Sequence, residues 1–250
     1  MRILVINPNT TASMTAKIGA AAKSIAATGT EIIAVNPRSG PASIEGYYDE
    51  AISLAGLLQV IEEHPGVDAI VLACFDDSGL DAARCIATCP VVAIGEAAFH
   101  MASLLADKFS VVTTLARSVP AIEHNLHRYG LATRCARVRS SEVAVLDLEH
   151  AAGPARAKID AEIRRAIDED RAEAIVLGCA GMADLTASLS AQHGLPVLDG
   201  VACAVTLCEG LARLGLKTSR LGGYAAPIKK ARKRGRVPEG AGSYHKALFR

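Results

Sequence analysis

The chain has 250 residues, of which half are hydrophobic and 21% are charged, and its formal net charge at pH 7 is +1. This length allows one large α/β domain or two smaller ones. The near-neutral charge and the lack of tryptophan argue against a nucleic-acid partner and against an anionic membrane surface.

The chain begins with a short apolar run at residues 3–6, which is too short for a signal peptide or a membrane span. Its seven cysteines are an odd number and lack the spacing of a disulfide framework. We therefore expect a cytoplasmic protein in which the cysteines are free thiols.

Short runs rich in valine and isoleucine alternate with amphipathic stretches along the chain. We predict strands at 3–7, 31–35, 69–74, 91–94, 110–114, 174–179 and 197–198. We predict helices at 12–26, 49–63, 79–87, 97–106, 120–129, 155–168, 182–192 and 202–214. Alternating strands and helices are typical of an α/β fold with parallel sheets that carry helices on both faces.

The second half of the chain repeats landmarks of the first half. FSVVTTL at 109–115 resembles the first predicted strand, because both are apolar strands that end in polar residues. Cys179 follows Cys74 by 105 residues, and each ends a predicted strand. Pro196 follows Pro90 by 106 residues, and each leads the next strand. This common offset indicates an internal duplication.

We expect each repeat to form one lobe of a pseudo-symmetric pair. The first lobe would comprise residues 1–97 and about 203–250, because we expect the last helix to pack back on it, and the second lobe would comprise 98–202. Ligands of open parallel sheets bind at the carboxyl ends of the strands, so facing lobes would share one cleft. The basic run KKARKRGR at 229–236 favours a solvated or subunit-contacting tail over a nucleic-acid arm.

Cys74 and Cys179 are the cysteines that the pattern marks for chemistry. At the junction of a strand and a helix, backbone N–H groups and the helix dipole favour a thiolate. The remaining cysteines have no such placement, and we interpret most of them as small core side chains. Cys85 and Cys89 share a helical spacing, but no second Cys/His pair accompanies them, so we predict no metal site.

Two equivalent thiols favour one kind of reaction. A cysteine phosphatase loop needs an arginine about six residues after the cysteine, whereas the first one after Cys74 is Arg84. A cysteine hydrolase pairs one thiol with a histidine and leaves the second thiol idle. Two facing thiols can instead remove a proton from one face of a carbon stereocentre and deliver one to the other face.

The chain resembles the Asp/Glu/hydantoin racemase superfamily, and within it the hydantoin and allantoin racemases. The resemblance rests on six motifs in order: NPNTT, GPASIEGYYDEA, ACFDDSGL, GEAAFHMAS, FSVVTTLAR and LGCAGM. It runs from the first strand to about Leu214, and it implies a homo-oligomeric, cofactor-independent racemase whose two bases are Cys74 and Cys179. The chain departs from the expected Gly-Asp-Pro after the first cysteine, where it has Asp76-Asp77-Ser78.

The loops around the two cysteines supply candidates for substrate binding. Removing a proton α to a carbonyl builds negative charge on the ring oxygen, which N–H and hydroxyl donors must stabilise. The asparagine and threonines among the candidates are also typical helix caps, and the loop around residue 43 has the composition of a turn. The predicted substrate-binding residues are Asn9, Ser43, Phe75, Ser78, Thr113, Thr114, Ala180 and Gly181.

The acids beside Cys74 predict a difference between the two thiols. Neighbouring carboxylates raise the pKa of a thiol, so we expect Cys179 to be the more acidic partner and Cys74 to rest protonated. The function that we predict is racemisation of 5-monosubstituted hydantoins at C5, with allantoin as the close alternative substrate. An amino-acid racemase and a non-catalytic ureide-binding module are remoter alternatives.

Overall fold

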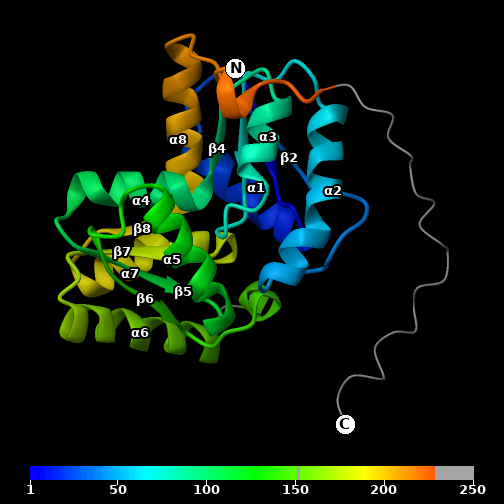
Figure 1. Cartoon of the computed structure of the whole chain (residues 1–250). Helices are drawn as coiled ribbons and strands as arrows, with labels where there is room; N and C mark the ends of the chain where they lie inside the picture. The colour runs from blue at the N-terminus through cyan, green and yellow to red at the C-terminus, as the bar shows by residue number, and fades with distance from the viewer. Residues whose placement is uncertain (151–152, 229–250) are drawn as a thin grey trace, which may run out of the picture.

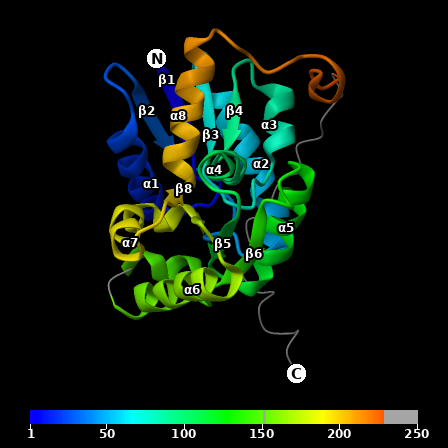
Figure 2. The ribbon, with the colours of Figure 1, turned by 90° about the vertical axis from the view of Figure 1, so that its left-hand side faces the viewer.

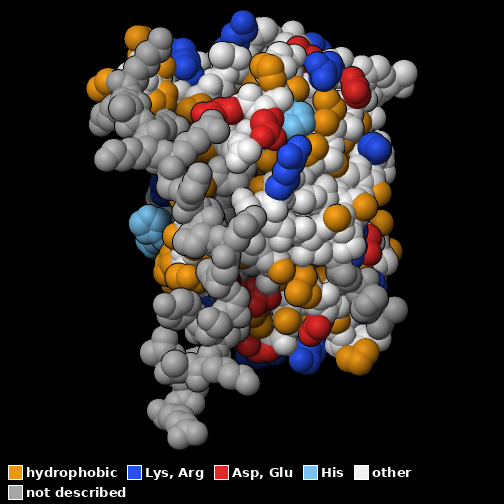
Figure 3. Space-filling view, turned by 90° about the vertical axis from the view of Figure 1, so that its right-hand side faces the viewer, with side chains coloured by type: hydrophobic (Ala, Val, Ile, Leu, Met, Phe, Trp, Pro, Cys, Tyr) orange, Lys and Arg blue, Asp and Glu red, His pale blue; other side chains and the backbone are white. Residues whose placement is uncertain are grey.

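The computed structural model describes residues 1–150 and 153–228, which form two α/β lobes (Figure 1). The basic run at 229–236 lies outside the described residues. Over the face that Figure 3 shows, acidic and basic side chains lie interspersed among apolar ones, in keeping with the net charge of +1. Within the described ranges, no helix combines the length and the apolar character that crossing a membrane requires.

The first lobe is built on a four-stranded parallel sheet with the order β2-β1-β3-β4. Its elements are β1 (Arg2–Ile6), α1 (Ala12–Ile25), β2 (Glu31–Val35), α2 (Tyr47–Glu63), β3 (Ala69–Leu72), α3 (Leu80–Ile86) and β4 (Val91–Ala93). Alternate residues of β1 face opposite sides of the sheet. Ile3 and Val5 join the core that contains α1, whereas Leu4 and Ile6 join the core beneath α2 and α3.

The second lobe repeats this topology in the strand order β6-β5-β7-β8, again with all strands parallel. Its regular elements are α4 (Ile94–Leu105), β5 (Phe109–Thr113), α5 (Val119–Arg128), β6 (Cys135–Ser140), α6 (Pro154–Asp170), β7 (Ala174–Gly178), α7 (Thr186–His193) and β8 (Val197–Asp199). The 3-10 helices are η1 (Ala116–Ser118), η2 (Val145–His150) and η3 (Ala180–Leu185). The predicted fold class is confirmed, and β3 and β7 occupy equivalent positions.

The chain then returns to the first lobe. The last long helix, α8 (Gly200–Arg213), packs against α1, β3 and β4 and along α4, and η4 (Gly222–Tyr224) follows it beside α3 (Figures 1 and 2). Side chains of both sheets meet at these helices in one continuous apolar core, which includes Val5 of β1 and Val111 of β5. This shared core holds the two lobes together.

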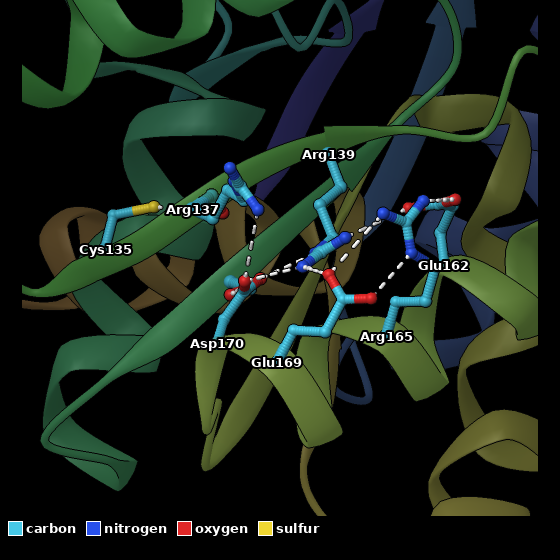
Figure 4. Close-up of polar contacts among 8 residues, drawn as sticks. Cys135, Arg137, Arg139, Glu162, Arg165, Glu169 and Asp170 are labelled. Carbon is cyan, nitrogen blue, oxygen red and sulfur yellow. Dashed lines mark hydrogen bonds and ion pairs between the residues drawn. The ribbon is translucent and has the colours of Figure 1, made fainter.

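All seven predicted strands and all eight predicted helices occur, although the predicted helix at 182–192 begins as the 3-10 helix η3 before α7. The strand that the sequence pattern missed is β6, whose sequence CARVRS carries little apolar character. An ion cluster holds this strand against α6 (Figure 4). The Arg139 side chain is only 4% exposed, and it lies 2.6 Å from Asp170 and 2.7 Å from Glu169.

Candidate active site

A cavity lies between the lobes at the carboxyl ends of the central strands, and the space within it and its solvent-open mouth is about 420 Å³. The first lobe contributes Asn7, Pro8, Asn9, Met14, Ile44, Ala73, Cys74, Phe75 and Asp76 to its lining. The second lobe contributes Thr114, Ser118, Val145, Gly178, Cys179 and Ala180. The two cysteines that the duplication paired therefore share one cavity, one from each lobe.

Cys74 stands in the turn that follows β3. Its carbonyl oxygen accepts a hydrogen bond from the Asp77 N–H at 3.1 Å, which closes the turn. Its sulfur lies 3.5 Å from the Ser78 hydroxyl and also accepts the Asp76 N–H. Burial raises the pKa of the Cys74 thiol, and the Asp76 carboxylate raises it further, against the smaller lowering by these hydrogen bonds.

Asp77 fixes this turn to the start of α4. Its carboxylate accepts the Gly95 N–H at 2.8 Å, the Glu96 N–H at 2.9 Å and the Tyr129 hydroxyl at 2.8 Å. The fit depends on glycine at position 95, because a Cβ there would lie 2.7 Å from the Phe75 carbonyl oxygen. Burial nevertheless raises the pKa of Asp77 to about 7. Asp77 is thus a positioning residue for the Cys74 turn.

Cys179 occupies the equivalent place after β7, where it precedes η3 directly. Its carbonyl oxygen accepts the Met182 N–H at 3.0 Å, and the Gly181 N–H donates to its sulfur. Burial raises the pKa of the Cys179 thiol to about 11, and the Asp76 carboxylate adds to this shift while the Lys17 ammonium opposes it. The acid in the first lobe therefore acts on the thiol of the second.

The expected acidification of the two thiols is wrong, because burial outweighs the local N–H donors at both sites. Next to Cys74 the reason is also geometric, since α3 begins only at Leu80, six residues further on. The expected order of the two thiols agrees with the structure. The pKa of Cys74 is raised beyond that of Cys179, and Asp76 is the largest charge effect on Cys74.

Several of the predicted binding residues line the cavity, and others lie behind it. Those in the lining are Asn9, Phe75, Thr114 and Ala180. The Asn9 side chain also accepts the Thr11 N–H at 3.0 Å, so it supports the start of α1 as well. Asn9 therefore both lines the cavity and supports the first turn of α1.

The remaining predicted residues have other surroundings. Ser78 and Gly181 contact the sulfurs of the two cysteines. The Thr113 hydroxyl donates to the Gly178 carbonyl oxygen at 2.9 Å, so it points to β7 rather than to the cavity. Ser43 is half-buried, and its neighbour Ile44 is the residue of that loop in the lining.

The cavity lining also includes residues of turns and 3-10 helices that no sequence motif marks. Ser118 ends η1 and Val145 begins η2, and neither belongs to a motif. Asp76 was treated only as a charge near Cys74, whereas its side chain is 8% exposed, lines the cavity and accepts a hydrogen bond from Ser118. Asp76 and Asp77 are adjacent acids, and the sequence contains no signal of which one faces the cavity.

Across the described ranges, no three His, Cys, Asp or Glu side chains gather closely enough to hold a metal ion. Polar contacts also tie the lobes around the cavity. The Val145 N–H donates to Glu45 at 3.0 Å, and the Lys17 ammonium donates to the Leu148 carbonyl oxygen and pairs with Asp184, both at 3.0 Å. These contacts hold the walls of the cavity in register.

One cysteine from each of two repeated α/β lobes lines the same cavity. The family model for Asp/Glu/Hydantoin racemase matches residues 3–208. The chain is 47% identical to a hydantoin racemase of a Pseudomonas species, over 92% of this chain and 93% of that relative. It is 48% identical to a hydantoin racemase of Rhizobium meliloti, over 92% and 97% of the two chains.

Among solved structures, the allantoin racemase from Klebsiella pneumoniae superposes with a TM-score of 0.91 at 49% identity, covering 94% of this chain and 97% of that one. The chain therefore belongs to the Asp/Glu/hydantoin racemase family, and it is an isomerase of the racemase class.

Proposed function

We propose that the protein racemises 5-monosubstituted hydantoins by proton exchange at C5, with Cys74 and Cys179 as the two bases. The observation that carries the proposal is the placement of these cysteines at equivalent strand ends in one cavity between the lobes. The names of the relatives support a cyclic ureide as substrate, either a hydantoin or allantoin, which is a hydantoin with a ureido group at C5.

In the proposed reaction, one cysteine acts as a thiolate and takes the C5 proton. The electron pair of the broken C–H bond moves toward the neighbouring ring carbonyl, and the opposite thiol then delivers its proton to the other face of C5. The two cysteines exchange protonation states in each turnover, so the reverse reaction uses the same groups with opposite roles. No net proton, electron or co-reactant is required.

The buried cavity sets the strength of these bases. Because burial raises both thiol pKa values, a thiolate formed beside the bound substrate is a stronger base than a solvated one. The N–H groups of Asp76 and Gly181 hydrogen-bond the sulfurs and stabilise the thiolate forms. We therefore assign the developing oxyanion to the N–H groups of Phe75 and Ala180, at roughly 3 kcal/mol per donor.

The lining argues against an amino-acid substrate. An α-amino acid carries a carboxylate, for which lysine and arginine are the strongest side-chain partners, and the lining residues of this cavity include neither. A neutral ring with amide groups fits a cavity of this composition better, because hydrogen-bond donors and acceptors satisfy it without a buried ion pair.

Incubation of a single enantiomer of a 5-substituted hydantoin in deuterated water tests the proposal. We expect the optical rotation to decay while deuterium appears at C5, and we expect the double variant Cys74→Ser/Cys179→Ser to lose both signals. Cys85→Ser is the matched control, because this thiol lies outside the cavity. Binding without decay or exchange by the wild-type protein would favour the ureide-binding module and refute the racemase.

A further inference from the structure

Asp76 is the one carboxylate among the described residues that line the cavity, and the proposed proton transfers do not use it. Its backbone is fixed from the second lobe, because the Asn125 amide donates to its carbonyl oxygen at 2.8 Å. Its side chain accepts the Ser118 hydroxyl, which also belongs to the cavity lining. Both contacts hold the carboxylate in place before any substrate enters.

The same residue also borders a second hollow on the outer side. This outer pocket opens to solvent over about 780 Å³ of space. It is lined by Tyr47, Glu50, Asp76, Asp77, Gly79, Leu80, Asp81, Ala82, Ala121, His124, Asn125 and Arg128. Asp76 therefore stands at the boundary between the cysteine cavity and a more open space.

The position of the substrate follows from the proposed function, on which this inference rests. The reacting carbon C5 lies between the two sulfurs, and its substituent is attached to that same carbon. Asp76 follows Cys74 by two residues and lines the cavity that both sulfurs share, and its charge raises the pKa of both thiols. The C5 substituent is consequently the part of the substrate within reach of this carboxylate.

A carboxylate presents about four acceptor sites, of which the Ser118 hydroxyl occupies one. An alkyl or aryl substituent would displace water from the remaining sites and leave a buried acid without partners, which is costly. A ureido group carries two N–H bonds that point in parallel, and these match the two oxygens of a carboxylate in a bidentate pair.

We propose that Asp76 is a specificity-determining residue that selects ureides whose C5 substituent presents paired N–H donors, as a ureido group does, over those with alkyl or aryl substituents. The preference arises from the penalty on the apolar substituent as much as from the hydrogen bonds to the ureido group. Asp76 thus refines the substrate class of the site without taking part in the proton transfer.

The test compares allantoin with 5-isobutylhydantoin in the wild-type protein and in Asp76→Leu. We expect the ratio of kcat/KM for allantoin to that for the alkyl compound to fall about a hundredfold in the variant, since a hydrogen-bonding site rejects a partner that lacks the donors. Asp76→Asn keeps the size of the side chain and loses one acceptor, and it should lower the ratio by a smaller factor.

Asp81→Asn is the matched control, because this acid lines only the outer pocket and should leave the ratio unchanged. The same comparison is made by calorimetric binding in the Cys74→Ser/Cys179→Ser background, where no turnover occurs. The inference is overturned if the Asp76 variants change kcat/KM by the same factor for both ureides. It is also overturned if Asp81→Asn changes the ratio as much as Asp76→Leu does. If the wild-type protein binds both ureides but racemises neither, the proposed function fails, while the binding ratio still decides the role of Asp76.

Discussion

The buried state of Cys179 makes a quantitative prediction about its reactivity. In the Cys74→Ser variant, Cys179 is the only thiol left among the cavity-lining residues, and its pKa is raised from 9.0 to about 11. Two pKa units reduce the thiolate fraction at a given pH about a hundredfold, which corresponds to roughly 2.7 kcal/mol. Only the thiolate reacts with an alkylating reagent, so the reaction rate reports this fraction.

The assay follows iodoacetamide labelling of Cys179 by peptide mass spectrometry from pH 6 to pH 10. Burial also slows access of the reagent at every pH, so the shape of the profile is the informative quantity. We expect the logarithm of the rate to rise with unit slope through pH 10, and we expect Asp76→Asn to shift the profile to lower pH. A plateau below pH 9 would refute the reasoning that burial dominates at this thiol.

Three further predictions concern stability and positioning. Burial raises the folded-state pKa of Asp76 from 3.8 to about 7, so the stability that its protonation contributes is complete below pH 4 and is lost as the pH rises through 7. The melting temperature should therefore fall between pH 5.5 and pH 8 in the wild-type protein and fall less in Asp76→Asn. Equal falls in the two proteins would contradict this. Arg139→Met removes the ion-pair partner closest to the buried Asp170, which keeps the Ser110 hydroxyl and the more distant Arg137, and it should cost about 3–5 kcal/mol in denaturant unfolding. The exposed Arg165→Ala should cost far less, and similar costs for the two variants would show that the cluster is not structural. Gly95→Ala places a Cβ against the Phe75 carbonyl oxygen and displaces the turn that carries Cys74, so it should lower kcat more than it raises KM. An unchanged kcat would show that the contact between this turn and α4 does not position Cys74.

The sequence predicted the fold largely because its strands are buried on both faces. Apolar runs such as those at β1 and β7 stand out from their amphipathic neighbours, and the offset between Cys74 and Cys179 revealed the repeat. Strand β6 escaped because an ion cluster, rather than an apolar face, holds it against α6. The duplication was the signal that could have predicted β6, because the predicted strands of the second lobe included no counterpart of β2.

The site was predictable where residues lie at strand ends and unpredictable where tertiary packing sets their direction. Cys74 and Cys179 follow central strands, so the topology brings them to one cavity. Asp76 and Asp77 are adjacent in sequence, yet one faces the cavity and the other caps α4. The turn separates them, because Asp77 adopts a positive φ of 53° that the sequence does not reveal.

The pKa shifts illustrate the same limit. Local rules assign a lowered pKa to a thiol at a strand-to-helix junction, but burial depends on which distant parts of the chain pack around it. Cys179 packs against a core cluster that includes Leu148 of η2. A residue more than thirty positions away in sequence therefore contributes to the environment of the thiol.

The two-base assignment is tested most directly by exchange at C5 in the single variants Cys74→Ser and Cys179→Ser. Each remaining thiol reaches only one face of the ring, so we predict that each variant incorporates deuterium from solvent into one enantiomer of a 5-substituted hydantoin, with opposite preferences and without racemisation. Exchange of both enantiomers by either single variant, or continued racemisation with one cysteine removed, would contradict the account.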